Sequence, residues 1–189
     1  ICNDNPYSFI LNDRPLSILA QPGAKECCLE LNSLSKAHNM AGWRIGMVAA
    51  CPEIITEILK VKSQMDSGMF KPLQLAAVEA LAQGAEWFAQ LNDEYRRRRV
   101  LAGEIFDLLG AEYDHDSSGM FLWGRVSSDS SEGVSPGERV SDRILYEAGV
   151  FITPGFIFGK NGEDYIRISL CAKPEVLKKA AQKIKSVIL

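Results

Sequence analysis

Residues 33–44 read SLSKAHNMAGWR, and this stretch, with the strand before it, says most about the fold. It follows a short, mostly apolar run at residues 27–31 that ends in turn-prone Asn32 and Ser33. We interpret this run as a buried strand that ends in a loop. Lys36 then lies just beyond the end of a strand, which is where open α/β sheets bind their ligands.

The residue types around Lys36 indicate a particular chemistry. A lysine amine that is shielded from water near another cation loses its proton more easily, and the neutral amine can form a Schiff base with a carbonyl. Arg44 offers a planar guanidinium suited to a phosphate, and Ser33 or Ser35 can add a hydroxyl donor. An aldehyde that also carries a phosphate is pyridoxal phosphate (PLP). The alternative is a solvated surface lysine, which the combined set of residues disfavours.

The Ser-x-Ser-Lys motif followed by Gly-x-Arg resembles the cofactor-lysine signature of the aspartate aminotransferase family, class I/II of the fold-type I PLP enzymes. The resemblance runs from Asp4 to the C-terminal helix and covers only the C-terminal half of such an enzyme. It implies that Lys36 is catalytic, holds PLP as a Schiff base and later moves a proton. It also implies that Ser33 and Arg44 hold the cofactor phosphate, with Ser35 as a further cofactor-binding candidate.

A second motif, Asp-x-x-Tyr, occurs at Asp4 and Tyr7, after a strand-like start of the chain. The edge formed by strand ends would place both residues near Lys36. In the family that the chain resembles, the aspartate pairs with the pyridinium nitrogen of PLP and the tyrosine hydroxyl bonds its phenolic oxygen. The resemblance therefore implies that Asp4 and Tyr7 bind the cofactor. The alternative is an aspartate that caps its own turn, ahead of a core tyrosine.

A third candidate, Arg167, lies in an alternating segment at residues 165–170. The alternation places Ile166, Ile168 and Leu170 on one face and Arg167 on the other. By itself this pattern fits a solvated edge or a structural ion pair. The family has a Tyr/Phe-x-Arg-x-Ser segment whose arginine binds the α-carboxylate of the substrate. The resemblance thus implies that Arg167 binds substrate, a task suited to a guanidinium.

Composition places further bounds on function. The 189 residues have a net charge of −3, and 47% of them are hydrophobic. This composition lacks the excess of basic residues that would indicate nucleic-acid binding. Five cysteines without a Cys-x-x-Cys pair and two histidines predict no metal site and a reducing, cytoplasmic location. No signal peptide or membrane-spanning run is expected. Because the sequence lacks an initial methionine and starts within an apparent strand, we expect a fragment or a processed piece.

The pattern along the chain predicts strands followed by helices, and then a mixture of shorter elements. The resemblance implies an α/β fold: the C-terminal part of a large PLP-binding domain, with a mostly parallel sheet and a linking helix (residues 1–95), followed by a small α+β domain (residues 96–189). The expected strands are residues 1–4, 27–32, 44–50, 120–126, 149–152 and 164–170. The expected helices begin at Pro52, cover residues 73–82, run from Gly84 to Gly110, cover residues 138–148 and begin at Pro174.

Three other features have simpler interpretations than a functional site. The run Arg96–Arg99 follows Asp93 and Glu94, so we expect a solvated helix face with ion pairs to neighbouring elements rather than a nucleic-acid patch. Residues 127–133 are expected to form a mobile surface loop. His38 is expected to make backbone hydrogen bonds rather than to act as a base.

The sequence therefore predicts a PLP-dependent aminotransferase that moves an amino group between an amino acid and a 2-keto acid. The resemblance also implies a homodimer, with residues 67–71 reaching the partner subunit. One alternative is a PLP-dependent lyase or synthase of the same fold. The other is an effector-binding module of a transcription regulator. The sequence does not identify the side chain of the substrate, and we expect the 189-residue chain alone to be inactive.

Overall fold

The computed structural model describes residues 1–127 and 133–188, so most of the surface loop predicted at residues 127–133 lies outside the described part. The chain divides into two compact units, Ile1–Leu91 and Asn92–Leu189. The domain boundary predicted after residue 95 stays a prediction. Among the described residues, no helix is both long enough and apolar enough to span a bilayer, and no three His, Cys, Asp or Glu side chains are grouped as a metal site.

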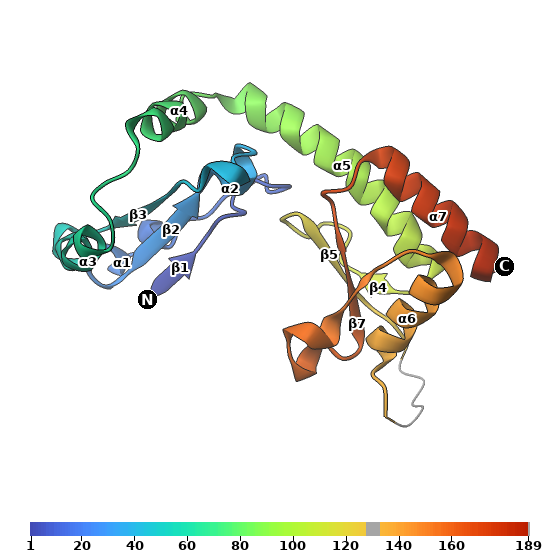
Figure 1. Ribbon diagram of the computed structural model, residues 1–189. Helices are drawn as coiled ribbons and strands as arrows, with labels where there is room; N and C mark the ends of the chain where they lie inside the picture. The colour runs from blue at the N-terminus through green and yellow to red at the C-terminus, as the bar shows by residue number, and fades with distance from the viewer. Residues whose placement is uncertain (128–132, 189) are drawn as a thin grey trace. The chain divides into compact units, whose positions relative to one another are not determined.

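The first unit contains a three-stranded sheet in the order β1-β2-β3 (Figure 1). The strands are β1 (Cys2–Asp4), β2 (Leu29–Ser33) and β3 (Gly46–Ala50). The pairing of β1 with β2 is parallel, whereas β2 and β3 are antiparallel. The expectation of a mostly parallel sheet therefore does not describe these three strands. The segment between β2 and β3 folds into a compact turn rather than a crossover, so β3 returns beside β2 in the opposite direction.

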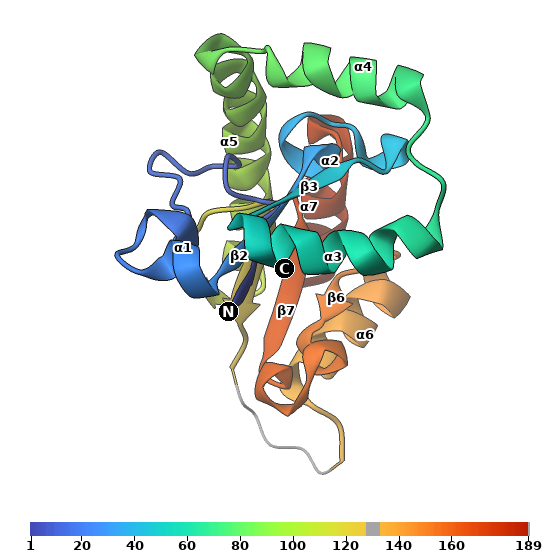
Figure 2. The same ribbon diagram turned by 90° about the vertical axis from the view of Figure 1, so that its left-hand side faces the viewer.

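Helices and short helical turns surround this sheet. They are η1 (Ile18–Ala20), α1 (Ala24–Cys27), α2 (Leu34–Ala37), η2 (Ala41–Trp43), α3 (Pro52–Met65) and α4 (Lys71–Leu81). Helix α3 begins with Pro52 in its first turn, where a missing N–H costs nothing, and it contacts β3 (Figure 2). A small core of Leu34, Met40 and Ile45 packs against apolar residues of α4. This core fixes the turn that carries Lys36.

The second unit is built on an antiparallel sheet in the order β4-β5-β7-β6. Its strands are β4 (Glu112–Tyr113), β5 (Phe121–Arg125), β6 (Thr153–Pro154) and β7 (Tyr165–Ser169). In β7 the side chains of Ile166 and Ile168 are buried, and Arg167 lies on the other face, as the alternation predicts. One face of the sheet thus builds the core, and the other presents Arg167.

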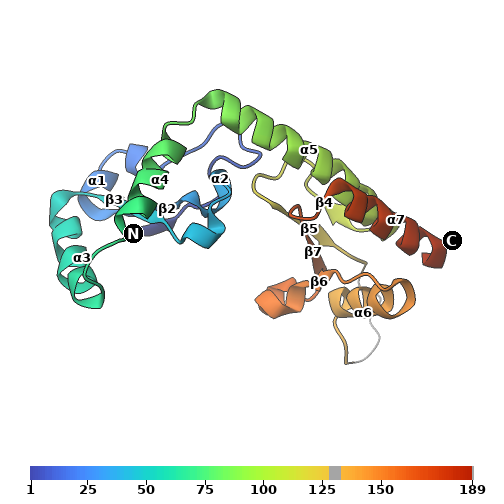
Figure 3. The same cartoon turned by 45° about the horizontal axis from the view of Figure 1, so that its top comes forward.

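Three helices complete the second unit. They are most of α5 (Ala85–Leu108), together with α6 (Pro136–Ala148) and α7 (Pro174–Ile188); the 3-10 turns are η3 (Gly155–Phe158) and η4 (Lys160–Gly162). Helix α7 runs along α5 in Figures 1 and 3, and both helices line one open groove. Phe106 of α5 is fully buried and packs on Gly124, where an added Cβ would lie 2.8 Å from the ring. Gly124 therefore allows the helix to approach the sheet closely.

Most predicted helices agree with the structure to within two residues, but two strands are displaced. The strand predicted from residue 27 begins at Leu29, because residues 24–27 form the helical turn α1. The strand predicted at residues 149–152 is replaced by β6 at Thr153–Pro154. Helix α5 ends at Leu108, and Gly110 follows with φ 65°, a conformation that favours glycine after a helix.

The sequence predicts ion pairs from the arginine run to neighbouring elements, but Arg96 and Arg98 form ion pairs within α5 itself. Arg96 and Arg98 form ion pairs with Asp93 and Glu94 at 2.8 and 2.9 Å. Arg98 also donates to the carbonyl of Leu170 at 3.1 Å, which ties the helix to the end of β7. These contacts give Arg96 and Arg98, two of the four arginines, a structural role.

Candidate functional site

The pairing of β1 with β2 places Asp4 beside the strand that leads to Lys36. Asp4 is aligned with Leu31, and the N–H of Asn5 donates to the carbonyl of Leu31 at 2.9 Å. The Asp4 side chain is exposed at the end of its short strand. The two strands run in the same direction, so their carboxyl ends, with Asp4 and Ser33, lie at one edge of the sheet.

Ser33 ends β2 and begins α2 as its N-cap. Its backbone is extended, and its hydroxyl oxygen accepts a hydrogen bond from the N–H of Ser35 at 3.1 Å. The hydroxyl of Ser33 also lies 2.9 Å from that of Ser35. Serine suits this position because its side chain satisfies a free N–H of the first turn. The cap therefore holds two hydroxyl groups together directly before Lys36.

Lys36 lies in the single turn of α2, and its side chain is half-buried. Its Nζ atom lies over the ring of Tyr7, 5.8 Å from the ring centroid, within the range of a cation–π contact. Among the described residues, no carboxylate or hydrogen-bond acceptor pairs with this amine. The structure thus brings Lys36 and Tyr7 together and leaves the amine available for a ligand.

Arg44 donates from Nη1 to the carbonyl of Ala41 at 3.0 Å, and its neighbour Ile45 contacts Ser33 and Leu34. The carbonyl of Ile45 accepts hydrogen bonds from the N–H of Leu34 at 3.2 Å and from the Ser33 hydroxyl at 3.4 Å. Arg44 itself is exposed and has a left-handed backbone, φ 53° and ψ 47°. This conformation costs a non-glycine residue about 1 kcal/mol. A strained backbone of this kind is common where a side chain must be aimed at a ligand.

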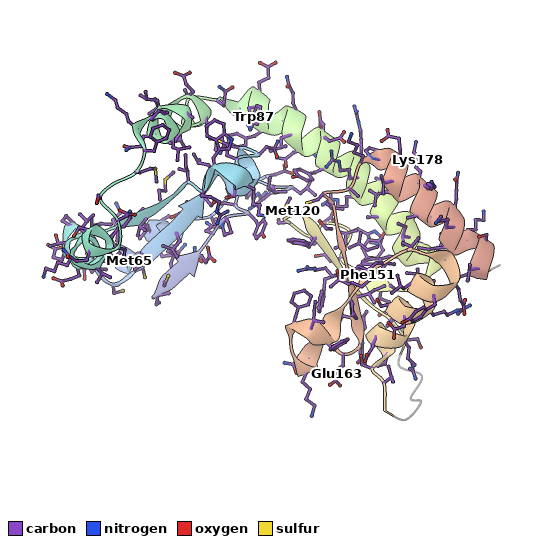
Figure 4. All side chains as sticks on the ribbon, in the orientation of Figure 1. Met65, Trp87, Met120, Phe151, Glu163 and Lys178 are labelled. Atoms are coloured by element: carbon purple, nitrogen blue, oxygen red, sulfur yellow. The ribbon has the colours of Figure 1, made fainter. Side chains whose placement is uncertain are left out.

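The start of α5 holds the turn of Lys36 in place. Trp87, labelled in Figure 4, donates its indole N–H to the carbonyl of Ala37 at 2.9 Å. The edge of the His38 ring meets Phe88, with centroids 5.5 Å apart, and Phe88 stacks on Phe9. The backbone N–H of His38 donates to the carbonyl of Leu34 at 3.3 Å, as any residue in this position of the turn can. The sequence reading missed Trp87 and Phe88, because nothing local links them to Lys36.

Burial affects the protonation of His38. Its Nδ1 atom is buried and has no hydrogen-bond partner among the described residues. Burial penalises the charged imidazolium and lowers the pKa of His38 below its ordinary value of 6.5. His38 is therefore neutral at pH 7, and it packs as an aromatic ring.

Arg167, in the second unit, is held between aromatic rings. Its Cζ atom lies 4.4 Å from the centroid of Phe121 and 4.3 Å from that of Phe158. The Nε atom is buried and has no hydrogen-bond partner in the described part of the chain. Trp123 continues the aromatic face, stacked on Tyr165 with centroids 5.2 Å apart. The sequence analysis placed Phe121 in an expected strand and gave Phe158 no role, so it missed this aromatic environment.

Six predicted site residues therefore lie in the first unit, and Arg167 lies in the second. The six residues are Asp4, Tyr7, Ser33, Ser35, Lys36 and Arg44. Their amine, hydroxyl, phenol, guanidinium and carboxylate groups fit the aldehyde, phosphate, phenolic oxygen and ring nitrogen of PLP. The amine of Lys36 has no polar partner in the described part of the chain, and this observation supports the fit, because a structural lysine in a half-buried turn would be expected to have one. The roles of the individual residues stay predictions.

Known proteins resemble this chain in sequence. The family pattern of aminotransferase class I and II matches residues 9–184. The chain is 40% identical over 186 residues to an LL-diaminopimelate aminotransferase of Natranaerobius thermophilus, covering 97% of this chain and 47% of that protein. It is also 40% identical over 191 residues to the protein of the same name from Aquifex aeolicus, covering 100% of this chain and 48% of that protein. The chain thus spans about half the length of these relatives.

Solved structures match the fold. An aromatic aminotransferase from Pyrococcus horikoshii matches with a TM-score of 0.86 and 31% identity, covering 98% of this chain and 50% of that one. A probable N-succinyldiaminopimelate aminotransferase from Thermus thermophilus matches with a TM-score of 0.84 and 33% identity, covering 98% of this chain and 49% of that one. The resemblance inferred from the Lys36 motif is confirmed. The chain belongs to the aminotransferase class I and II family, whose members generally use PLP.

Proposed function

We propose that this chain is the part of a PLP-dependent aminotransferase that supplies the cofactor lysine and the carboxylate-binding arginine. The observation that carries the proposal is the half-buried Lys36 amine, which lies over Tyr7 without a polar partner among the described residues. Its neighbours Ser33 and Arg44 are the groups that a phosphate needs. The 40% identity to proteins named LL-diaminopimelate aminotransferase supports the same reaction class.

Each residue of the first unit has a role that follows from its chemistry. PLP, when bound, supplies an electron sink for the electron pair left by removal of a proton from the substrate. Lys36 would form the covalent link to the cofactor, and its Nζ atom, once free, would carry the proton to and from the α-carbon. Asp4 would keep the ring nitrogen protonated, and the Tyr7 hydroxyl would donate to the phenolic oxygen. Ser33, Ser35 and Arg44 would hold the phosphate.

Arg167 binds the α-carboxylate of the substrate. Its guanidinium is half-buried between Phe121 and Phe158, and its Nε atom has no partner in the described residues. A cation in an apolar setting binds an anion more strongly than a solvated one does, because less water must be displaced. The aromatic rings therefore favour binding of a planar carboxylate.

The roles proposed for Lys36 and Arg167 imply that the substrates are an amino acid and a 2-keto acid. The names of the two relatives make LL-diaminopimelate the first amino donor to test. We propose a homodimer as the assembly and the cytoplasm as the location, as the sequence predicts. All five cysteines are free thiols, which fits a reducing compartment.

The experiment measures amino transfer by the protein expressed from its own gene. The protein is supplied with PLP, a panel of amino acids that includes LL-diaminopimelate, and 2-oxoglutarate or pyruvate as acceptor. Formation of the matching keto acid, with retention of the amino group on the acceptor, supports the proposal. Elimination of the side chain, or condensation without amino transfer, would instead indicate a lyase or a synthase.

The effector-binding alternative predicts a different result. A regulator of this fold would bind PLP at Lys36 and an amino acid near Arg167, but it would turn over no substrate. Binding of an amino acid without any keto acid product, over the whole panel, would favour that alternative and overturn the proposed activity.

A further inference from the structure

The carboxylate of Glu30 forms a buried hydrogen-bond centre in the middle of β2. The side chain is 5% exposed, and five groups donate to its two oxygens. The donors are Asn3 Nδ2 at 3.3 Å, Asn5 Nδ2 at 3.4 Å, Ser17 Oγ at 2.8 Å, the N–H of Ile18 at 2.9 Å and Asn32 Nδ2 at 2.8 Å. Three amides, a hydroxyl and a backbone N–H thus converge on one carboxylate.

All five donors are uncharged, so the carboxylate is stabilised by dipoles rather than by an ion pair. Burial alone would favour the neutral acid, but the donors from Ser17, Ile18, Asn3 and Asn5 outweigh it and hold the pKa of Glu30 below its ordinary value. The ionised form can accept all five hydrogen bonds, whereas a protonated acid would bring a competing O–H into the cluster. The network is therefore matched to an ionised carboxylate.

Along the chain, the donors flank two residues of the candidate site, Asp4 and Tyr7. Asn3 and Asn5 are the two neighbours of Asp4 in the chain, and both donate to Glu30. Asn5 begins the segment that contains Tyr7, and Ser17 and Ile18 end it. Glu30 therefore closes residues 5–18 into a loop, and it holds β1 on both sides of Asp4.

The sheet separates this network from the site. Asn3 is aligned with Glu30, so both side chains lie on one face, whereas Asp4 is aligned with Leu31 and lies on the other. Glu30 therefore acts on Asp4 through the backbone rather than by contact. The nearest comparable glutamate of this unit, Glu26, is exposed on α1 and has no such network among the described residues.

We propose that Glu30 is a positioning residue, whose buried carboxylate fixes β1 and the loop of residues 5–18 so that Asp4 and Tyr7 face Lys36. The inference deepens the proposed function, and it rests on that function only where it concerns the cofactor. Its central statement, that Glu30 sets the contact between Tyr7 and Lys36, can be tested without PLP.

Glu30→Gln is the decisive variant because it preserves shape and removes the charge. One carboxylate oxygen becomes an NH₂ group that faces two or three donors, so those hydrogen bonds are lost. Ser17→Ala removes a single donor and serves as a milder variant if Glu30→Gln does not fold. Glu26→Gln is the matched control, since it makes the same chemical change at an exposed site.

The first measurement is the ring chemical shift of Tyr7 in the protein expressed from its own gene, recorded by NMR without cofactor. In the parent chain, Lys36→Met should shift the ring signals of Tyr7, because the cation over the ring is removed. When Glu30→Gln is also present, Lys36→Met should shift the Tyr7 signals by less than half as much. When Glu26→Gln is present instead, Lys36→Met should cause the full shift. Amide exchange at Ile18 should become at least tenfold faster in Glu30→Gln. An unaltered Lys36→Met response in both Glu30→Gln and Ser17→Ala would overturn the proposal, even if the variants were less stable.

The second measurement adds PLP and follows the absorbance of its adduct with Lys36 against pH. We expect the midpoint of this titration to move by at least half a unit in Glu30→Gln, because Asp4 and Tyr7 no longer hold their positions. Ile105→Val, a core change in the second unit, is the control, and we expect it to destabilise the protein without altering the midpoint. Equal midpoints in parent and Glu30→Gln would overturn the inference. Absence of any adduct in the parent protein expressed from its own gene would count against the proposed function, and the cofactor-free NMR result would still decide the role of Glu30.

Discussion

The Nζ atom of Lys36 lies 5.8 Å from the centre of the Tyr7 ring, although the two residues belong to different segments of the first unit. The parallel pairing of β1 with β2 brings these segments together, and the N-cap of Ser33 turns the chain so that Lys36 points toward the ring. A cation over an aromatic face is stabilised by the ring without a fixed counter-ion. The amine is thereby oriented and remains available for chemistry.

Lys36→Ala should abolish covalent attachment of PLP. Borohydride reduction of the protein with PLP, followed by peptide mapping, should place a pyridoxyl group on Lys36 of the parent and nowhere in the variant. Transamination should fall by at least about a hundredfold, because the group that moves the proton is missing. Lys60→Ala, which removes an exposed partner of Glu57, is the control and should leave both results unchanged. A pyridoxyl group on another lysine of the parent would contradict the assignment.

Arg167→Leu should impair substrate binding while leaving the cofactor in place. Loss of a desolvated charged contact costs about 3 kcal/mol, so kcat/KM should fall about a hundredfold or more. The absorbance of the bound cofactor should not change. Arg125→Leu is the matched control, because Arg125 is exposed and pairs only loosely with Asp164 at 3.6 Å. A loss of less than tenfold in Arg167→Leu would mean that Arg167 is structural.

Phe158→Leu tests the aromatic environment of Arg167. Leucine retains apolar contact but removes the ring that lies 4.3 Å from the guanidinium carbon. A cation–π contact contributes about 1 kcal/mol, so KM for the amino acid should rise about fivefold, with little change in kcat. Phe158→Tyr keeps a ring and should behave like the parent, and Phe151→Leu, at an exposed site, should have no effect. Equal KM values in Phe158→Leu and the parent would show that the ring does not support Arg167.

His38 should make the protein less stable in mild acid. Because burial lowers the pKa of His38 below 6.5, the unfolded chain binds a proton more readily than the folded chain once the pH falls below 6.5. The free energy of unfolding should therefore decrease from pH 6.5 down to the folded pKa. In His38→Phe this decrease should be smaller, whereas it should be retained in His115→Gln, which changes the other histidine. Thermal unfolding at pH 7.5 and 5.5 measures the difference, and identical pH dependence in all three proteins would refute it.

Local sequence determined the elements and the identity of the lysine. The Ser33–Arg44 stretch carries its own N-cap, turn and cation, so its meaning depends on residues that are close in the chain. Pro52 and Pro174 mark the starts of α3 and α7 for the same reason. The alternation of β7 likewise predicts which face carries Arg167, since successive side chains of a strand point to opposite sides.

Tertiary structure decided the contacts that support these residues. The antiparallel return of β3, the Trp87 hydrogen bond to Ala37 and the rings around Arg167 all join segments that are distant in sequence. Glu30 is the clearest case, because in sequence it is one acidic residue in an apolar run, and its donors lie up to 27 residues away. Periodicity and capping describe energies within a few residues, whereas a buried carboxylate is stabilised only when the folded chain brings its donors together.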